Sequence, residues 1–217
     1  MSGHLTLNII SKIKNEFKKN CIQLLYESYA SALVSERDFR EKTENEVTVM
    51  LIGFMKKNPK SNLLRIDITR EFYLDSEETY AGELNPDASP RIDIRFMNWT
   101  NSDKIEYFIE SKNICENNWV KPGTGAIVDA RKLHRRYIDT GIQNFIDGRY
   151  PMGCIVGYVM QGDPVKIADK LNLILVQSKR EAEQLSPIAD EELRKEFLSK
   201  HSNSSIADLH HYFLCFN

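Results

Sequence analysis

The sequence predicts an α/β protein with a mixed β-sheet flanked by helices, whose core has the order helix, three strands, helix, strand. Three observations favour this class. Stretches with apolar residues three and four positions apart, typical of helices, alternate with stretches of period two, typical of half-buried strands. A continuous apolar run follows them over residues 152–160. The 217 residues, of which 41% are hydrophobic, suffice for the core of one domain.

The N-terminal part of the chain predicts helices. Apolar residues recur at helical spacing from Leu5 to about Val34, which indicates one long amphipathic helix or two. A second helix should begin after Thr43, because Glu46 lies three residues later, at the spacing of a capping box. The segment 56–59, which ends in a proline, should terminate this helix.

Three strands should come next. Residues 64–74 alternate apolar and polar side chains and predict a half-buried strand. A polar loop is expected over 75–89, followed by strands over 91–97 and 105–112 that are joined by turn-forming residues.

The second half of the chain predicts the helix and strand that complete the core. Residues 126–147 have helical periodicity, with a bend expected at Gly141. The run 152–160 lies between Pro151 and Gly162 and indicates a fully buried central strand. The remaining expected elements are helices over 163–183 and 187–200 and a last strand over 210–216.

Composition excludes several classes of protein. The 29 Lys and Arg residues against 31 Asp and Glu give a net charge of −2, so any nucleic-acid site must be a local patch. The longest nearly apolar run, 47–55, is far shorter than the ~20 residues of a membrane span, and no secretion signal is recognisable. We therefore expect no membrane association and a cytoplasmic location. The four cysteines are widely spaced, which argues against a zinc site or disulfides.

The second and third strands carry the chemistry. If their turn is centred on Asn101 and Ser102, residues whose numbers sum to 203 are paired, and Asp93 lies opposite Glu110. Their Cβ atoms would be about 5 Å apart, and directly opposed like charges destabilise a sheet.

A positive charge must compensate this acidic pair. One possibility is a salt-bridge ladder with neighbouring cations on the same face, namely Arg91, Arg95 and Lys112. The other is a divalent ion such as Mg²⁺ or Mn²⁺, which binds converging carboxylate oxygens. Spacing alone leaves both possibilities open.

Pro90-Arg-Ile-Asp93 followed by Glu110-Ser-Lys112 resembles the PD-(D/E)xK nuclease superfamily, which has the restriction-endonuclease-like fold and the core order αβββαβ. The dipeptide Pro-Asp of that family is here separated by two residues. The resemblance implies that Asp93 and Glu110 bind Mg²⁺ or Mn²⁺, that Ser111 contributes its backbone carbonyl, and that Lys112 orients or activates the attacking water. It predicts a single nuclease-like domain over 1–217, with an N-terminal helical extension (1–42), a catalytic core (43–160) and C-terminal helices with a last strand (161–217).

Further site residues are candidates by position. Members of this family often add an acidic residue from the helix before the sheet, for which Glu46 is the first candidate and Glu44 the second; Glu46 could equally serve only the capping box. Trp119 and Lys121 could stack on or steer nucleic acid. The candidate phosphate-binding residues are Lys121, Arg131, Lys132 and Arg135, although a solvated helix face would explain the last three equally well.

The resemblance implies a Mg²⁺-dependent endodeoxyribonuclease that hydrolyses DNA phosphodiester bonds, in a restriction or anti-phage defence role. Cleavage of both strands of a duplex suggests a homodimer or a partner in a defence complex. The alternative is a noncatalytic nuclease-fold scaffold or DNA-binding subunit of a larger complex.

Overall fold

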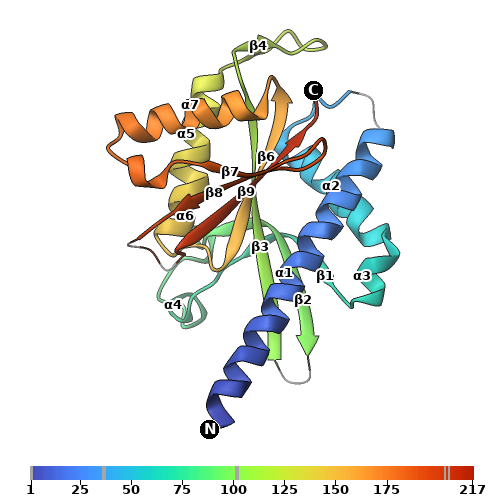
Figure 1. Ribbon diagram of the computed structural model, residues 1–217, viewed down its shortest axis with the longest axis vertical. Coiled ribbons are helices and arrows are strands. Elements are labelled where there is room, and N and C mark those ends of the chain that lie inside the picture. The colour runs from blue at the N-terminus through green and yellow to red at the C-terminus, as the bar shows by residue number, and fades with distance from the viewer. Residues whose placement is uncertain (1, 36–37, 101–102, 203, 205) are drawn as a thin grey trace.

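A seven-stranded mixed β-sheet forms the centre of the computed structural model, which describes residues 2–35, 38–100, 103–202, 204 and 206–217. Its strand order is β1-β2-β3-β6-β9-β8-β7 (Figure 1). The strands are β1 (Asp67–Tyr73), β2 (Arg91–Thr100), β3 (Asp103–Cys115), β6 (Gly153–Gln161), β7 (Ser186–Asp190), β8 (Lys195–Lys200) and β9 (Asp208–Cys215). β3, β6 and β9 are parallel, and the outer pairs are antiparallel. The α/β class predicted from the sequence is confirmed.

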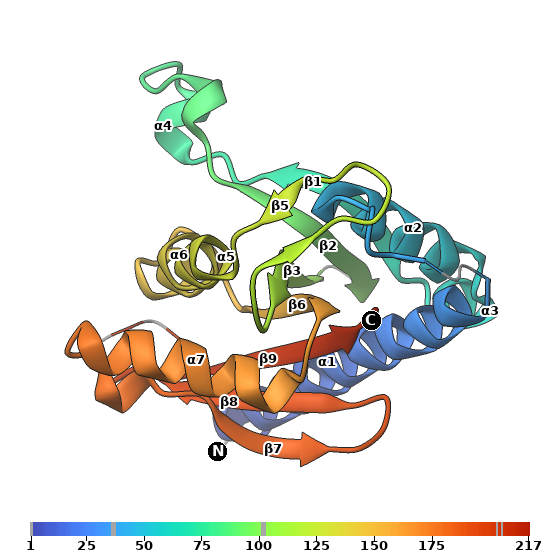
Figure 2. The same cartoon turned by 90° about the horizontal axis from the view of Figure 1, so that it is seen from above.

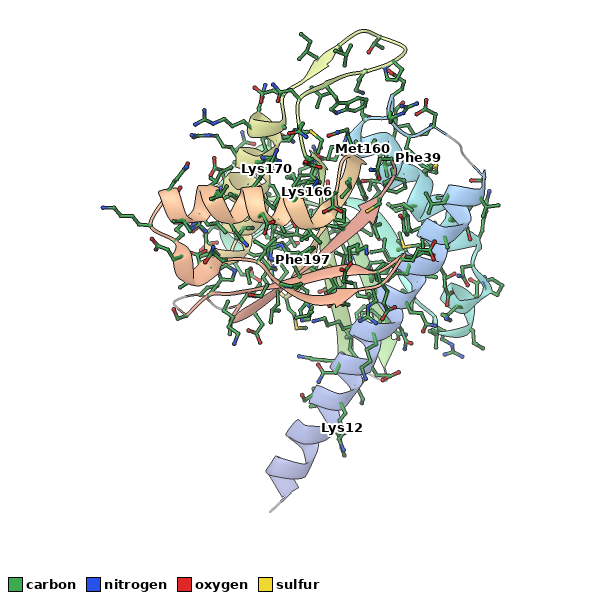
Figure 3. All side chains as sticks on the ribbon, turned by 45° about the horizontal axis from the view of Figure 1, so that its top comes forward. Lys12, Phe39, Met160, Lys166, Lys170 and Phe197 are labelled. Carbon is green, nitrogen blue, oxygen red and sulfur yellow. The ribbon has the colours of Figure 1, made fainter. Side chains whose placement is uncertain are left out.

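Helices cover both faces of this sheet (Figure 2). On one face lie α1 (Ser2–Ser35), α2 (Glu44–Lys57) and α3 (Pro59–Leu63); on the other lie α5 (Ala130–Arg136), the π-helix η2 (Tyr137–Ile142), α6 (Gln143–Ile146) and α7 (Pro164–Gln177). α1 buries Cys21, Leu24 and Leu25 completely against the first face. Its N-terminal part, which carries Lys12, projects beyond the sheet (Figure 3). None of the helices in the described part of the chain is long and apolar enough to cross a membrane.

The expected start of α2 is confirmed. The hydroxyl of Thr43 accepts the backbone N–H of Glu46, and the carboxylate of Glu46 accepts the backbone N–H of Thr43, so both halves of the capping box are present. The helix ends at Lys57, and Asn58 caps both it and the short α3 that follows.

The expected register of β2 and β3 is confirmed from Ile94 to Thr100, but the expected pairing of Asp93 with Glu110 does not form, because the ladder ends at Ile94 and Ile109. Ile94 pairs with Ile109 and Phe96 with Tyr107, and both pairs sum to 203. The expected turn centre at residues 101–102 lies outside the described residues.

Several expected elements differ in the structure. Residues 187–200 form the hairpin β7–β8 rather than a helix, because pairing with β9 satisfies their backbone groups and buries Phe197 and Ser199 at period two. The helix expected from 126 begins at Ala130, and the bend expected at Gly141 is a π-helix. The segments not predicted are the hairpin of β4 (Trp119–Val120) and β5 (Ile127–Val128), α4 (Glu77–Tyr80) and η1 (Pro86–Ala88). The helix expected over 163–183 is divided into α7, which ends at Gln177, and the 3-10 helix η3 (Glu181–Glu183).

Candidate active site

β2 and β3 separate at the acidic pair. The last residues paired between them are Ile94 and Ile109; beyond this point β2 continues beside β1, and β3 continues beside β6. Asp93 and Glu110 are the next residues on the two strands. One carboxylate oxygen of Asp93 accepts the backbone N–H of Ser111 at 2.6 Å, where a strand would otherwise bond. We call the place where β2 and β3 separate, at Asp93 and Glu110, the fork. Both carboxylates therefore lie beside an opening in the sheet.

Lys112 closes the inner part of this fork. Its ammonium forms an ion pair with Oε1 of Glu110 and donates to the backbone carbonyl of Ser111 at 2.9 Å. Glu110 is 4% exposed and Lys112 is 6% exposed, so the pair is largely shielded from water. Oε2 of Glu110 is buried and has no hydrogen-bond partner. A buried carboxylate oxygen without a partner is costly, and it is available to a ligand.

Glu44, not Glu46, reaches the fork from α2. The Oε1 atom of Glu44 lies 3.8 Å from the ammonium of Lys112 and 3.8 Å from the guanidinium of Arg136, and its Oε2 accepts the backbone N–H of Asn113 at 2.9 Å. The carboxylate of Glu46 is exposed and turns back to Thr43. Residues two apart on a helix lie about 200° apart, so only one of these glutamates can face the fork. The first candidate for the helix-borne acid is thus placed outside the site and the second within it.

The carboxylates at the fork are shielded from water and therefore repel one another strongly. Burial raises the pKa of Glu110 to about 8; Lys112 opposes this shift, while Asp93 and Glu44 add to it. Burial also raises the pKa of Asp93, against the effect of Lys112. Burial would lower the pKa of Lys112, but Glu110, Glu44 and Asp93 raise it above its ordinary value. Three carboxylates thus share the ammonium of Lys112, with the guanidinium of Arg136 beside Glu44 as a further positive charge, and a divalent cation would relieve the remaining repulsion.

Hard oxygen ligands suit Mg²⁺ and Mn²⁺, and Asp93, Glu110 and Glu44 supply them here. Among the described residues, however, no group of three or more His, Cys, Asp or Glu side chains already has a metal-holding arrangement. In the structure the Lys112 ammonium occupies Oε1 of Glu110. The chemistry of the donor set fits the ion, and side-chain rotations at the fork would be needed to hold it.

The fork opens into a cleft of about 660 Å³. Glu44, Asp93, Glu110 and Lys112 border it, together with Asn113. Six further cationic residues and one further acid, Asp129, also line the cleft; the cations are Arg40, Lys42, Arg91, Lys121, Lys132 and Arg136. An acidic centre with a basic surround can hold a phosphate group while its charge is balanced.

The sequence-predicted phosphate-binding residues divide between this cleft and other surfaces. Lys121 and Lys132 line the cleft, whereas Arg131 lines a separate hollow between α5 and α7. Arg135 is exposed on α5 and does not line the cleft. Arg136 does, because it lies four residues beyond Lys132 and therefore on the same side of the helix.

Sequence reasoning missed two residues that shape the site. The hydroxyl of Tyr150 donates to the carbonyl of Arg91 at 2.9 Å and so fixes β2 beside the fork. Gly141 in the π-helix lies against the aliphatic part of Lys112, where a Cβ atom would be 3.8 Å from its Cγ. Tyr150 carried no signal, since its partner is a backbone atom far away in the sequence; Gly141 was marked only as a bend.

No family model, curated protein or solved structure matches this chain.

Proposed function

We propose that this protein is a metal-dependent nuclease that hydrolyses DNA phosphodiester bonds on a restriction-endonuclease-like fold. The observation that carries the proposal is the convergence of Asp93, Glu110 and Glu44 with Lys112 where β2 and β3 separate. The chain order α2, β1, β2, β3, α5, β6 supports the fold part of the proposal.

In this proposal Asp93 and Glu110 hold Mg²⁺ or Mn²⁺, and the partnerless Oε2 of Glu110 is the oxygen available for it. The ion would supply charge stabilisation at phosphorus and a bound water of lowered pKa. Lys112 orients the attacking water and stabilises the charge that develops on the phosphate. Glu44 holds Lys112 and Arg136 in place through its two 3.8 Å contacts.

A matched pair of glutamate variants on α2, together with a variant of Lys112 on β3, tests the proposal. Supercoiled plasmid is incubated with the protein and Mg²⁺ or Mn²⁺, and nicking is followed on agarose gels. Glu44→Gln and Lys112→Met should each slow nicking by roughly 10²-fold or more, because the first removes the charge that holds Lys112 and Arg136 in place and the second removes the ammonium that stabilises the developing charge. Glu46→Gln should nick like the wild type, because glutamine preserves the capping box. Equal nicking by all four proteins would reject the assignment.

A second measurement follows metal binding without activity. Mn²⁺ that binds only the folded state raises the unfolding temperature in proportion to the logarithm of its concentration. We expect this rise for the wild type and not for Glu110→Gln, whereas Glu46→Gln should respond like the wild type.

One observation favours the noncatalytic scaffold as the second candidate. The Lys112–Glu110 pair is already closed and buried, as in a structural salt bridge, and no metal-holding group is preformed in the described part of the chain. This reading predicts no nicking and no shift of the unfolding temperature with Mn²⁺.

A further inference from the structure

The cleft has two walls that come from distant parts of the chain. One wall is the segment between α1 and α2 together with the start of α2, which supplies Arg40 and Glu44. The other is the β4–β5 hairpin followed by α5, which supplies Lys121 and Lys132. Figure 2 shows the loop of the hairpin reaching across to the segment that precedes α2.

Glu41 ties these walls together. Its Oε1 accepts the backbone N–H of Gly123 at 2.6 Å, and its Oε2 accepts the hydroxyl of Thr124 at 3.4 Å. The ammonium of Lys121 donates to the backbone carbonyl of Glu41 at 2.8 Å. The loop has little space for a side chain at Gly123, where a Cβ atom would lie 3.3 Å from the Glu41 carboxyl carbon. We call these contacts between Glu41 and residues 121–124 the clasp.

The clasp joins the two walls of the cleft. Glu110 is only 4% exposed, so a phosphate must enter the cleft to approach its carboxylate. Duplex DNA is stiff over some 150 base pairs and costs energy to bend or open. A single strand is flexible, and one or two of its nucleotides can enter a cleft whose walls are joined.

The hairpin also places an aromatic side chain at the edge of the cleft. Trp119 lies on β4 and borders the cleft; its side chain is partly buried against the hydrophobic core, and its indole nitrogen is buried. Nearby on the hairpin, Val120 and Ile127 are 58% and 78% exposed. Proteins that bind single strands combine a basic groove with aromatic rings on which bases stack.

We propose that the cleft takes single-stranded DNA, with a base stacked on Trp119 and the adjacent backbone directed to the fork, and that the clasp discriminates against duplex DNA. This proposal rests on the proposed nuclease function for the role of the fork.

Binding without metal tests the substrate class first. A fluorescein-labelled 20-nucleotide strand and the matching duplex are titrated in EDTA, and anisotropy is measured. The single strand should bind at least ~10-fold more tightly than the duplex. Trp119→Ala should weaken single-strand binding by ~10-fold or more, because stacking is lost. Trp99→Ala, which removes a 61% exposed tryptophan of β2 that does not line the cleft, should leave binding unchanged. Equal or tighter duplex binding overturns the proposal, and so does tighter binding of a single-stranded RNA.

Fluorescence reports on the stacking directly. The chain has 2 tryptophans, so Trp99→Phe leaves Trp119 as the only one. Single-stranded DNA should quench its emission, and absence of quenching despite binding would remove Trp119 from the proposal.

The role of the clasp can be tested with a separate variant. Glu41→Ala removes both side-chain contacts and should raise duplex affinity towards that of the single strand. An unchanged ratio would show that the clasp does not discriminate. With Mg²⁺ present, failure to cut any DNA contradicts the nuclease function, whereas equally fast cutting of duplex and single strand contradicts only the present proposal.

Discussion

At the residue scale, a buried chain of hydrogen bonds links the π-helix to β8 and β9. The hydroxyl of Tyr137 lies 2.9 Å from Nδ1 of His211, whose Nε2 is 2.8 Å from the hydroxyl of Ser199. That hydroxyl is 2.7 Å from Nε2 of His201, and Nδ1 of His201 is 3.0 Å from Glu183. The ionised carboxylate of Glu183 can only accept a hydrogen bond. When both histidines are neutral, each hydrogen bond in this series is therefore donated in the direction of Glu183.

This series of buried hydrogen bonds predicts that the folded protein loses stability in acid. Burial lowers the pKa of His211 to about 3 and also lowers the pKa of His201, which Glu183 partly opposes. Both folded-state values lie below the unfolded value of about 6.5, so stability is complete above pH 6.5 and is lost as pH falls towards 3. Because His211 binds a proton in the unfolded state but not in the folded state, it alone should lower the free energy of unfolding by about 2 kcal/mol between pH 7.5 and pH 5.

Urea unfolding at the two pH values measures this loss. His211→Asn should be less stable than the wild type at pH 7.5 but should lose less on acidification, since its side chain no longer titrates. An equal loss in both proteins would exclude His211 as the source.

At the scale of elements, the contact between β3 and β6 holds the fork in place. These strands pair in parallel, and Gly153 lies opposite Phe108. A Cβ atom at Gly153 would be 2.3 Å from the carbonyl oxygen of Phe108, which is backbone and cannot rotate away. Gly53 on α2, by contrast, has nothing within 4 Å of its Cβ position.

Two alanine substitutions should therefore act in opposite directions. Gly153→Ala should lower the free energy of unfolding by about 3 kcal/mol, because the central strands must separate. Gly53→Ala should raise it by up to ~1 kcal/mol, because alanine favours a helix and nothing obstructs it. Urea denaturation of the three proteins gives both values; a stable Gly153→Ala protein would mean that β6 can shift relative to β3.

At the scale of the whole molecule, charge is distributed unevenly. The net charge is −2, yet six cationic residues surround the acidic fork. DNA binding should therefore be local and sensitive to salt rather than a general property of the surface.

The dependence of single-strand affinity on salt concentration tests whether the cationic residues of the cleft contact the DNA. Neutralisation of about two phosphates in the cleft should give a slope of roughly −1.4 in log K against log salt. Lys132→Ala should make the slope shallower by ~0.7, because this side chain lines the cleft. Arg135→Ala, on the same helix but outside the cleft, should leave it unchanged. The reverse result would place the DNA on the other side of α5.

Features that depend on neighbours along the chain could be predicted from the sequence. The capping box at Thr43, the pairing of β2 with β3 and the buried β6 all follow from local spacing and periodicity, and each is present. Such features are decided by steric and hydrogen-bonding preferences within a few residues.

The further groups that meet at the fork could not be predicted, because they are brought together by packing between distant segments. The phase of α2 brings Glu44 rather than Glu46 to Lys112, and β9 draws residues 195–200 into the sheet. Glu41 meets Gly123 across a gap of 82 residues. Contacts of this kind carry no local signal, because their free energy is gained only when distant segments are already packed together.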